Sequence, residues 1–116
     1  MAAIDQVKAH FSRLGTLNLE VPEWAAEDGR PMVIYYTPMT LSEKAKLLRV
    51  GEEFGSDNRV AHTLITKAKD AQGNALFTLE DKHTLMHQAD YNVAMRVALR
   101  MNEAVSVVMM RLSKNP

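Results

Sequence analysis

The chain has no cysteine and is poor in aromatic and turn-forming residues. Its 116 residues include one Trp, five Gly and four Pro. Without Cys, the chain can form neither a disulfide nor a thiolate zinc site, and it has no thiol nucleophile. The composition therefore gives no indication of a secreted disulfide scaffold.

The chain also has no net charge of either sign. The 14 basic and 14 acidic residues cancel, whereas a chain built to bind nucleic acid usually carries a clear basic excess. No apolar run has membrane-spanning length, and the start MAAIDQVKAH is not a signal peptide pattern. We therefore expect neither a nucleic-acid partner nor a membrane partner, and we expect binding through shape and apolar contact.

Apolar residues make up 47% of the chain, which is enough for one hydrophobic core. The patterns predict an α+β fold that is mostly helical and forms a single domain over residues 1–116. An N-terminal helix over 1–15 would precede a β-hairpin over 16–37 and a helical region over 40–112.

The N-terminal third combines a helical and an alternating pattern. Strands are predicted at 16–21 and 32–37, joined through a turn at Asp28-Gly29, because apolar and polar residues alternate in the first and β-formers dominate the second. A helix over 3–14, ended by Gly15, is predicted from the spacing of Ile4, Val7, Phe11 and Leu14.

Two helices are predicted next. Thr40 and Glu43 form a capping-box pattern at the start of a helix over 41–54. That helix is expected to bury Leu41, Ala45, Leu48 and Phe54. Asp57 can cap a second helix over 58–69, for which a strand over 63–69 is the alternative. The stripe that favours the helix consists of Val60, Ala61, Leu64, Ile65 and Ala68.

The C-terminal part is strongly helical. After a polar turn at 70–74, Thr78 begins a helix, and Asp90 either caps a new helix or lies within a continuous one. A long C-terminal helix is predicted over 91–112, and it is apolar on most sides. A chain of this size has few elements to cover such a helix, so we expect a partner or a homo-oligomer to cover the rest.

Methionine is frequent in this region and has two interpretations. Met side chains fill gaps in ordinary cores, but they are also common on surfaces that adapt to varied partners. On the second interpretation, the expected partner-binding residues are Met95, Met101, Val105, Val108, Met109 and Leu112.

One group of residues resembles a metal-ligand set. Glu80, His83 and His87 would share one helix face, but Thr84 stands where a zinc protease has its general base. A solvated polar helix face explains the same three residues. No nucleophile elbow, phosphate loop or dinucleotide fingerprint is present. We therefore expect a non-enzyme with no catalytic residues, no metal and no cofactor, and a metal-binding enzyme using this trio is an alternative.

The order of the segments resembles a known family. VPEW leads into VIYYTPMTLSEKAKLL, and a helical segment then runs into DAQGNALFTLEDKHTL before the last helix. This order resembles the tail assembly chaperones of long-tailed bacteriophages and prophages, over about residues 20–105. The family's T-x-x-E helix start and D-x-x-G-x-x-L-F-T segment correspond to Thr40, Glu43, Asp70, Gly73, Leu76, Phe77 and Thr78. Residues 1–15 depart from the family pattern.

The resemblance implies a non-enzymatic helper in the cytoplasm of a bacterial host. Such proteins coat the tape-measure protein, help to recruit tail-tube subunits and self-associate. In many members a ribosomal frameshift near the end of the gene gives a longer product, and Lys114-Asn115 is compatible with a slippery codon pair. Alternatives are another small phage structural or connector protein and a helical adaptor of host origin.

Overall fold

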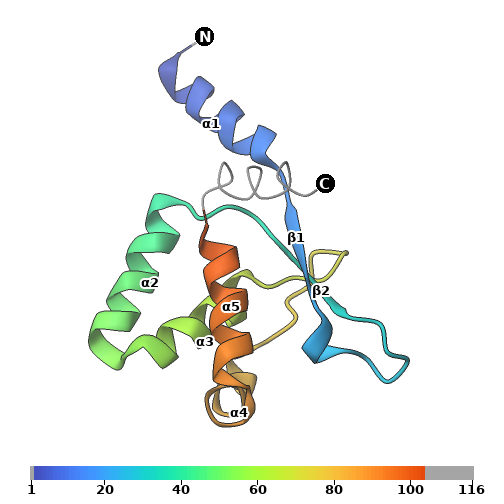
Figure 1. Ribbon diagram of the computed structural model, residues 1–116. Helices are drawn as coiled ribbons and strands as arrows, with labels where there is room; N and C mark the ends of the chain where they lie inside the picture. Colours follow the sequence, from blue (N-terminus) through green and yellow to red (C-terminus); the bar gives the residue numbers. More distant parts are fainter. Residues whose placement is uncertain (1, 104–116) are drawn as a thin grey trace.

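The computed structural model describes residues 2–103, and it has the α+β, mostly helical fold that the sequence predicts. Its elements are α1 (Ala3–Leu14), β1 (Leu17–Val21), the 3₁₀ helix η1 (Pro22–Trp24), β2 (Met32–Tyr36), α2 (Leu41–Phe54), α3 (Ser56–Lys67), the 3₁₀ helix η2 (Leu79–Asp81), α4 (Lys82–Gln88) and α5 (Tyr91–Asn102). In Figure 1, α5 lies between α2 and the hairpin, and α3 packs against both α2 and α5. None of the helices within residues 2–103 has the length and apolar character needed to cross a bilayer.

The predicted hairpin is confirmed. Strands β1 and β2 pair antiparallel, with Leu19 opposite Ile34. The turn at Asp28-Gly29 depends on the positive φ of Gly29, which is +84° and favours glycine. Asn18 and Glu20 are exposed, while the residues between and after them are buried, as the alternation predicts.

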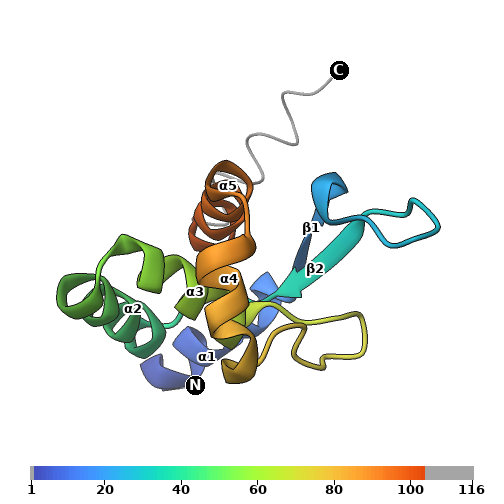
Figure 2. The same ribbon diagram turned by 90° about the horizontal axis from the view of Figure 1, so that it is seen from below.

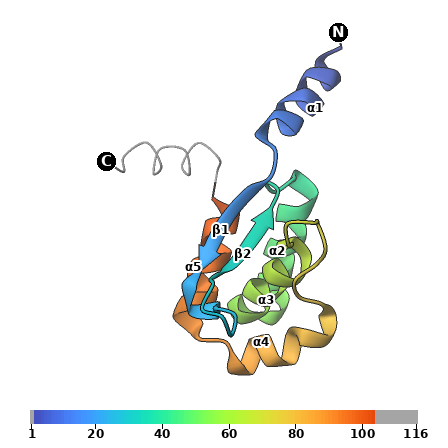
Figure 3. The ribbon, with the colours of Figure 1, turned by 90° about the vertical axis from the view of Figure 1, so that its right-hand side faces the viewer.

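The core lies between one face of this hairpin and helices α3 and α5. Figures 2 and 3 show the two helices on the same side of the strands. The buried residues of this cluster are Leu19, Val21, Ile34, Tyr36, Leu64, Ala68, Val93, Val97 and Met101. Partly buried residues close its edge, among them Trp24 and Phe77, whose rings meet edge to face with centroids 6.1 Å apart.

Helix α2 has the predicted ends but not the predicted buried face. Thr40 and Glu43 form both hydrogen bonds of the capping box, and the helix ends before Gly55. Leu47 is the residue that α2 buries. The prediction that α2 buries Leu41, Ala45, Leu48 and Phe54 is wrong, because all four are exposed.

The reason is the rotation of α2 about its axis. The row Glu43, Leu47 and Gly51, with spacing i, i+4 and i+8, faces α3. Gly51 admits the Arg59 side chain, whose Cδ would lie 3.1 Å from a Cβ at that position. The more apolar row of the helix is therefore turned outward.

The structure corrects the predicted starts of two later helices and decides between the two alternatives for a third. Helix α3 begins at Ser56, so Asp57 lies inside its first turn and does not cap it, and residues 63–67 are helical and not a strand. Asp90 caps a new helix, since its carboxylate accepts the N–H of Val93 at 3.0 Å. Thr78 forms the predicted cap, but the segment that follows it begins with the 3₁₀ helix η2, and α4 starts only at Lys82.

The prediction of one continuous helix over 91–112 is wrong, because the helix is interrupted at residue 103. Helix α5 ends at Asn102, and Glu103 has an extended backbone, with φ −70° and ψ 148°. The Asn102 side chain donates to the carbonyl oxygen of Ala98 at 2.8 Å, which is the kind of competition with the backbone that ends helices at Asn. The rest of the predicted helix lies outside the described residues.

Helix α1 is confirmed as a helix, but it buries none of its residues. It projects from the rest of the molecule in Figures 1 and 3. Its apolar stripe of Ile4, Val7 and Phe11 is exposed. Gly15, with φ +67°, joins it to β1.

We therefore expect truncation of the α1 stripe to leave the monomer's stability almost unchanged. Phe11→Ala should alter the free energy of unfolding by less than about 0.5 kcal/mol, as for exposed positions. Met101→Ala is the matched truncation in the core and should cost about 2–5 kcal/mol. Urea unfolding followed by circular dichroism measures both, and a loss at Phe11 close to that at Met101 would show that α1 contributes to the core.

Candidate functional site

An apolar groove runs between α2 and α5 over the surface of α3. It encloses about 240 Å³. We call it the α2–α5 groove, and its lining residues are Lys44, Leu47, Leu48, Arg59, Val60, Thr63, Met95, Ala98, Leu99 and Asn102. Six of these ten residues are apolar, and Leu48 and Leu99 remain 46% and 58% exposed. Large apolar side chains on facing helices are therefore available to a partner.

Helix α5 reaches this groove because it has two apolar faces. Val93, Val97 and Met101 point into the core, whereas Met95 and Leu99 lie on the neighbouring face. The spacing of four between Met95 and Leu99 places them in one row along the helix. The sequence correctly indicated a helix that is apolar on more than one side.

A second hollow continues the groove toward α4. It holds about 90 Å³ and is lined mainly by apolar residues of α3, α4 and α5. Val60 and Met95 line both hollows, so the two form one continuous apolar surface. Met95 is half-buried at their junction, where a flexible side chain can adjust to different partners.

The predicted partner-binding residues have different outcomes. Met95 lies in the groove, where a partner can contact it. The prediction for Met101 is wrong, since this side chain is 1% exposed and packs in the core. The other four, Val105, Val108, Met109 and Leu112, lie outside the described residues.

Sequence reasoning missed most of the groove. The sequence predicts Leu48 to lie in the core and indicates no role for Leu99, Lys44 or Arg59, although all four line the groove. One signal for the groove was present in the sequence. Leu41, Ala45 and Leu48 form a second apolar row on the helix over 41–54, and a second apolar row is compatible with an outward-facing contact surface. Choosing between the two rows required the position of α3.

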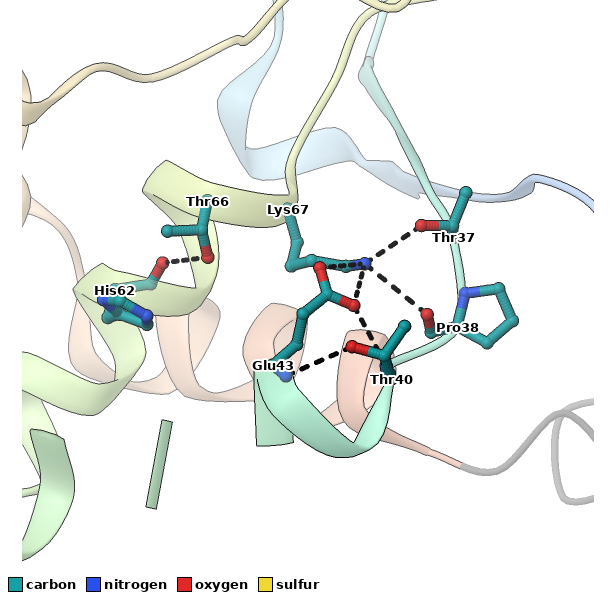
Figure 4. Close-up of polar contacts among 7 residues, drawn as sticks. All are labelled: Thr37, Pro38, Thr40, Glu43, His62, Thr66 and Lys67. Atoms are coloured by element: carbon teal, nitrogen blue, oxygen red, sulfur yellow. Dashed lines mark hydrogen bonds and ion pairs between the residues drawn. The ribbon is translucent and has the colours of Figure 1, made fainter. Parts of the chain in front are cut away.

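A polar hollow of about 570 Å³ lies at the C-terminal end of α3, between the end of β2 and the 69–73 turn. Its lining includes Lys67, which is 5% exposed. Figure 4 shows the Lys67 Nζ donating to Thr37 Oγ1 at 2.9 Å and to both Glu43 carboxylate oxygens at 3.0 and 3.1 Å. The ammonium group is already paired, so we interpret it as a structural tie between α3, α2 and β2 and not as a free anion-binding group.

The pKa of Glu43 reflects this arrangement. Burial raises the pKa of the Glu43 carboxyl group. Hydrogen bonds from the N–H of Thr40 and from the ammonium group of Lys67, together with the charge of Lys67, lower the pKa by a larger amount, so the net pKa lies below the ordinary 4.5. A carboxyl group with a lowered folded-state pKa stabilises the fold above its unfolded-state pKa. That contribution is lost as the pH falls through the folded-state value.

We therefore expect the stability difference between the wild type and Glu43→Gln to depend on pH. The difference should be full at about pH 7 and should shrink progressively below about pH 4.5, because protonation removes the same charge. Thermal unfolding at a series of pH values measures it. A difference that stays constant down to about pH 2.5 would contradict the assigned pairing.

The metal-ligand hypothesis gains no support from the geometry. The rings of His83 and His87 are neighbours on α4, with centroids 4.4 Å apart, and both side chains are exposed. Glu80 belongs to η2, in a different helical geometry. Within residues 2–103, no group of three or more acidic or His side chains is arranged to hold a metal ion.

The residues that carried the family resemblance have structural roles. Asp70 closes its turn by accepting the N–H groups of Gln72 and Asn74, both at 2.9 Å. Leu76 and Phe77 pack against the core, and Thr78 caps η2. The shared pattern therefore describes how the chain folds, while the groove is formed by other residues.

Comparisons with protein-family models, with curated proteins and with solved structures found no match. The α2–α5 groove is the described feature that best indicates a function, because it combines exposed aliphatic side chains with a concave shape.

Proposed function

We propose that this chain is a non-enzymatic tail assembly chaperone that binds an amphipathic helix of a phage tape-measure protein in the α2–α5 groove. The observation that carries the proposal is the exposed apolar lining of that groove, with Leu48 on one wall and Leu99 on the other. The identity of the partner comes from the family resemblance.

The shape of the groove suits a helix. Two helices form its walls and a third forms its floor, so an added helix would complete a four-helix packing arrangement. An incoming apolar row with spacing i, i+3 and i+7 would contact Leu48, Met95 and Leu99. Tape-measure proteins contain long hydrophobic helices, and covering such a row would keep them in solution until the tail assembles.

The proposal also includes a homo-oligomer and the recruitment of tail-tube subunits in the bacterial host cytoplasm. These properties are taken from the resemblance, and we assign no described residues to them.

Co-purification tests the proposal. A long helical tape-measure gene is expected directly downstream, and its product, expressed with a tagged form of this chain, should co-purify and stay soluble. A tape-measure product that neither binds nor gains solubility would contradict the proposal. Mass spectrometry of purified virions is the second readout, because a chaperone should be absent from them and a connector protein should be present.

A further inference from the structure

The charges in the α2–α5 groove have one sign. Lys44 and Arg59 are the ionised side chains of its lining, and they lie on α2 and α3. The three ion pairs found within residues 2–103 are Arg30–Asp28, Lys67–Glu43 and Arg96–Glu23. Neither groove cation belongs to one of them.

Two further polar groups of the lining, the Thr63 hydroxyl and the Asn102 side-chain NH₂, are already used as donors. The hydroxyl of Thr63 donates to the carbonyl oxygen of Arg59 at 3.0 Å, and the side-chain NH₂ of Asn102 donates to the carbonyl oxygen of Ala98 at 2.8 Å. The adjoining hollow is lined by one acid, Asp57, and its Oδ1 accepts the N–H of Asn58. A helix seated in the groove would remove water from Lys44 and Arg59, and this is unfavourable unless the helix supplies acceptors.

The chain's own apolar segments do not meet this requirement. In α1 the exposed stripe is flanked by Lys8, while Asp5, the helix's acid, lies on the opposite side. The sequence over 104–116 contains Arg111 and Lys114 and no acid. Both segments would bring positive charge to a positive groove, so the charge pattern favours a different chain.

We propose that the groove selects an amphipathic helix whose apolar row is flanked by Asp or Glu residues. This inference rests on the proposed function and adds the chemistry of the bound segment. Within a tape-measure protein, it points to acid-flanked apolar helices as the bound segments, in preference to lysine-flanked ones.

Two synthetic peptides test the inference with the full-length protein. Both have about 18 residues and the same Leu/Ala row, and they carry either Glu or Lys at the flanking positions. Fluorescence anisotropy at low salt should give a Kd about tenfold lower for the Glu-flanked peptide. Added salt should reduce this preference because it screens the charges.

Charge-reversal variants test whether Lys44 and Arg59 cause the preference for the Glu-flanked peptide. The double variant K44E/R59E should reverse it, and K44E alone should weaken it if the double variant unfolds. The matched control is K46E/R49E, which makes the same charge change at exposed positions of α2 outside the groove lining and should keep the preference for Glu.

The outcomes separate this inference from the proposed function. Equal binding of both peptides, or tighter binding of the Lys-flanked one, overturns the charge selection and leaves the groove as a helix-binding site. A preference that survives in K44E/R59E also overturns it. Binding of neither peptide overturns the groove as a helix site, and the charge selection with it.

Discussion

Glu43→Ala is expected to lower the free energy of unfolding by about 3 kcal/mol, whereas Lys67→Met is expected to cost about 1 kcal/mol or less. The two residues form one ion pair with N–O distances of 3.0 and 3.1 Å, but their exposure differs. The Lys67 side chain is 5% exposed and that of Glu43 is 39% exposed. Removing the acid leaves a buried cation, while removing the cation leaves a carboxylate that water can reach.

Two further variants separate the ion pair from the helix cap. Glu43 also accepts the N–H of Thr40, so part of its effect belongs to the capping box. Thr40→Ala disrupts the cap and should cost about 1 kcal/mol. The double variant Glu43→Ala/Lys67→Met should be more stable than Glu43→Ala alone. Equal costs for the two single variants in urea unfolding would contradict a pair in which the lysine is the buried partner.

The second large effect is expected in binding. The double variant Leu48→Asp/Leu99→Asp should weaken binding of a tape-measure helix at least about 100-fold, because it places two carboxylates in an apolar contact. Its melting temperature should change little, since both positions are partly exposed. Isothermal titration calorimetry with a tape-measure fragment measures the affinity.

Leu41→Asp provides the matched control. Leu41 is an equally apolar residue of α2 and is 94% exposed, but it does not line the groove. Its substitution should leave the affinity within about threefold of the wild type. A loss at Leu41 as large as that of the groove variant would place the binding surface on the outer face of α2.

Local signals predicted the parts of the fold that local interactions determine. The capping box at Thr40, the Asp70 turn and the alternation in β1 each depend on neighbours within a few residues. These features are present in the structure as predicted, because their hydrogen bonds and side-chain directions follow from spacing alone.

Tertiary contacts determined what the sequence predicted wrongly. Helix α2 offers two rows, and the choice between Leu47 and Leu48 as the buried residue depends on Lys67 and Arg59 of α3. Periodicity carries no information on such distant partners. The assignment of Met101 to a contact surface failed for the same reason, because its position in the core is set by its packing with the other residues of the core cluster.

The candidate site was predictable only in outline. The sequence indicated that the last helix is apolar on several sides and predicted Met95 to be a contact residue, and Met95 lines the groove. The opposite wall, with Leu48 and Lys44, could not be predicted because it comes from a helix about 50 residues earlier in the chain.

The most direct test of the groove is a titration followed by NMR of the methionine methyl groups. Addition of an acid-flanked tape-measure helix to protein labelled at the Met ε-methyl groups should shift the Met95 resonance strongly. The resonances of Met32, which is in β2, and of Met101 in the core should stay almost in place. A bound complex in which Met95 does not shift would contradict the account, because the partner would then lie outside the α2–α5 groove.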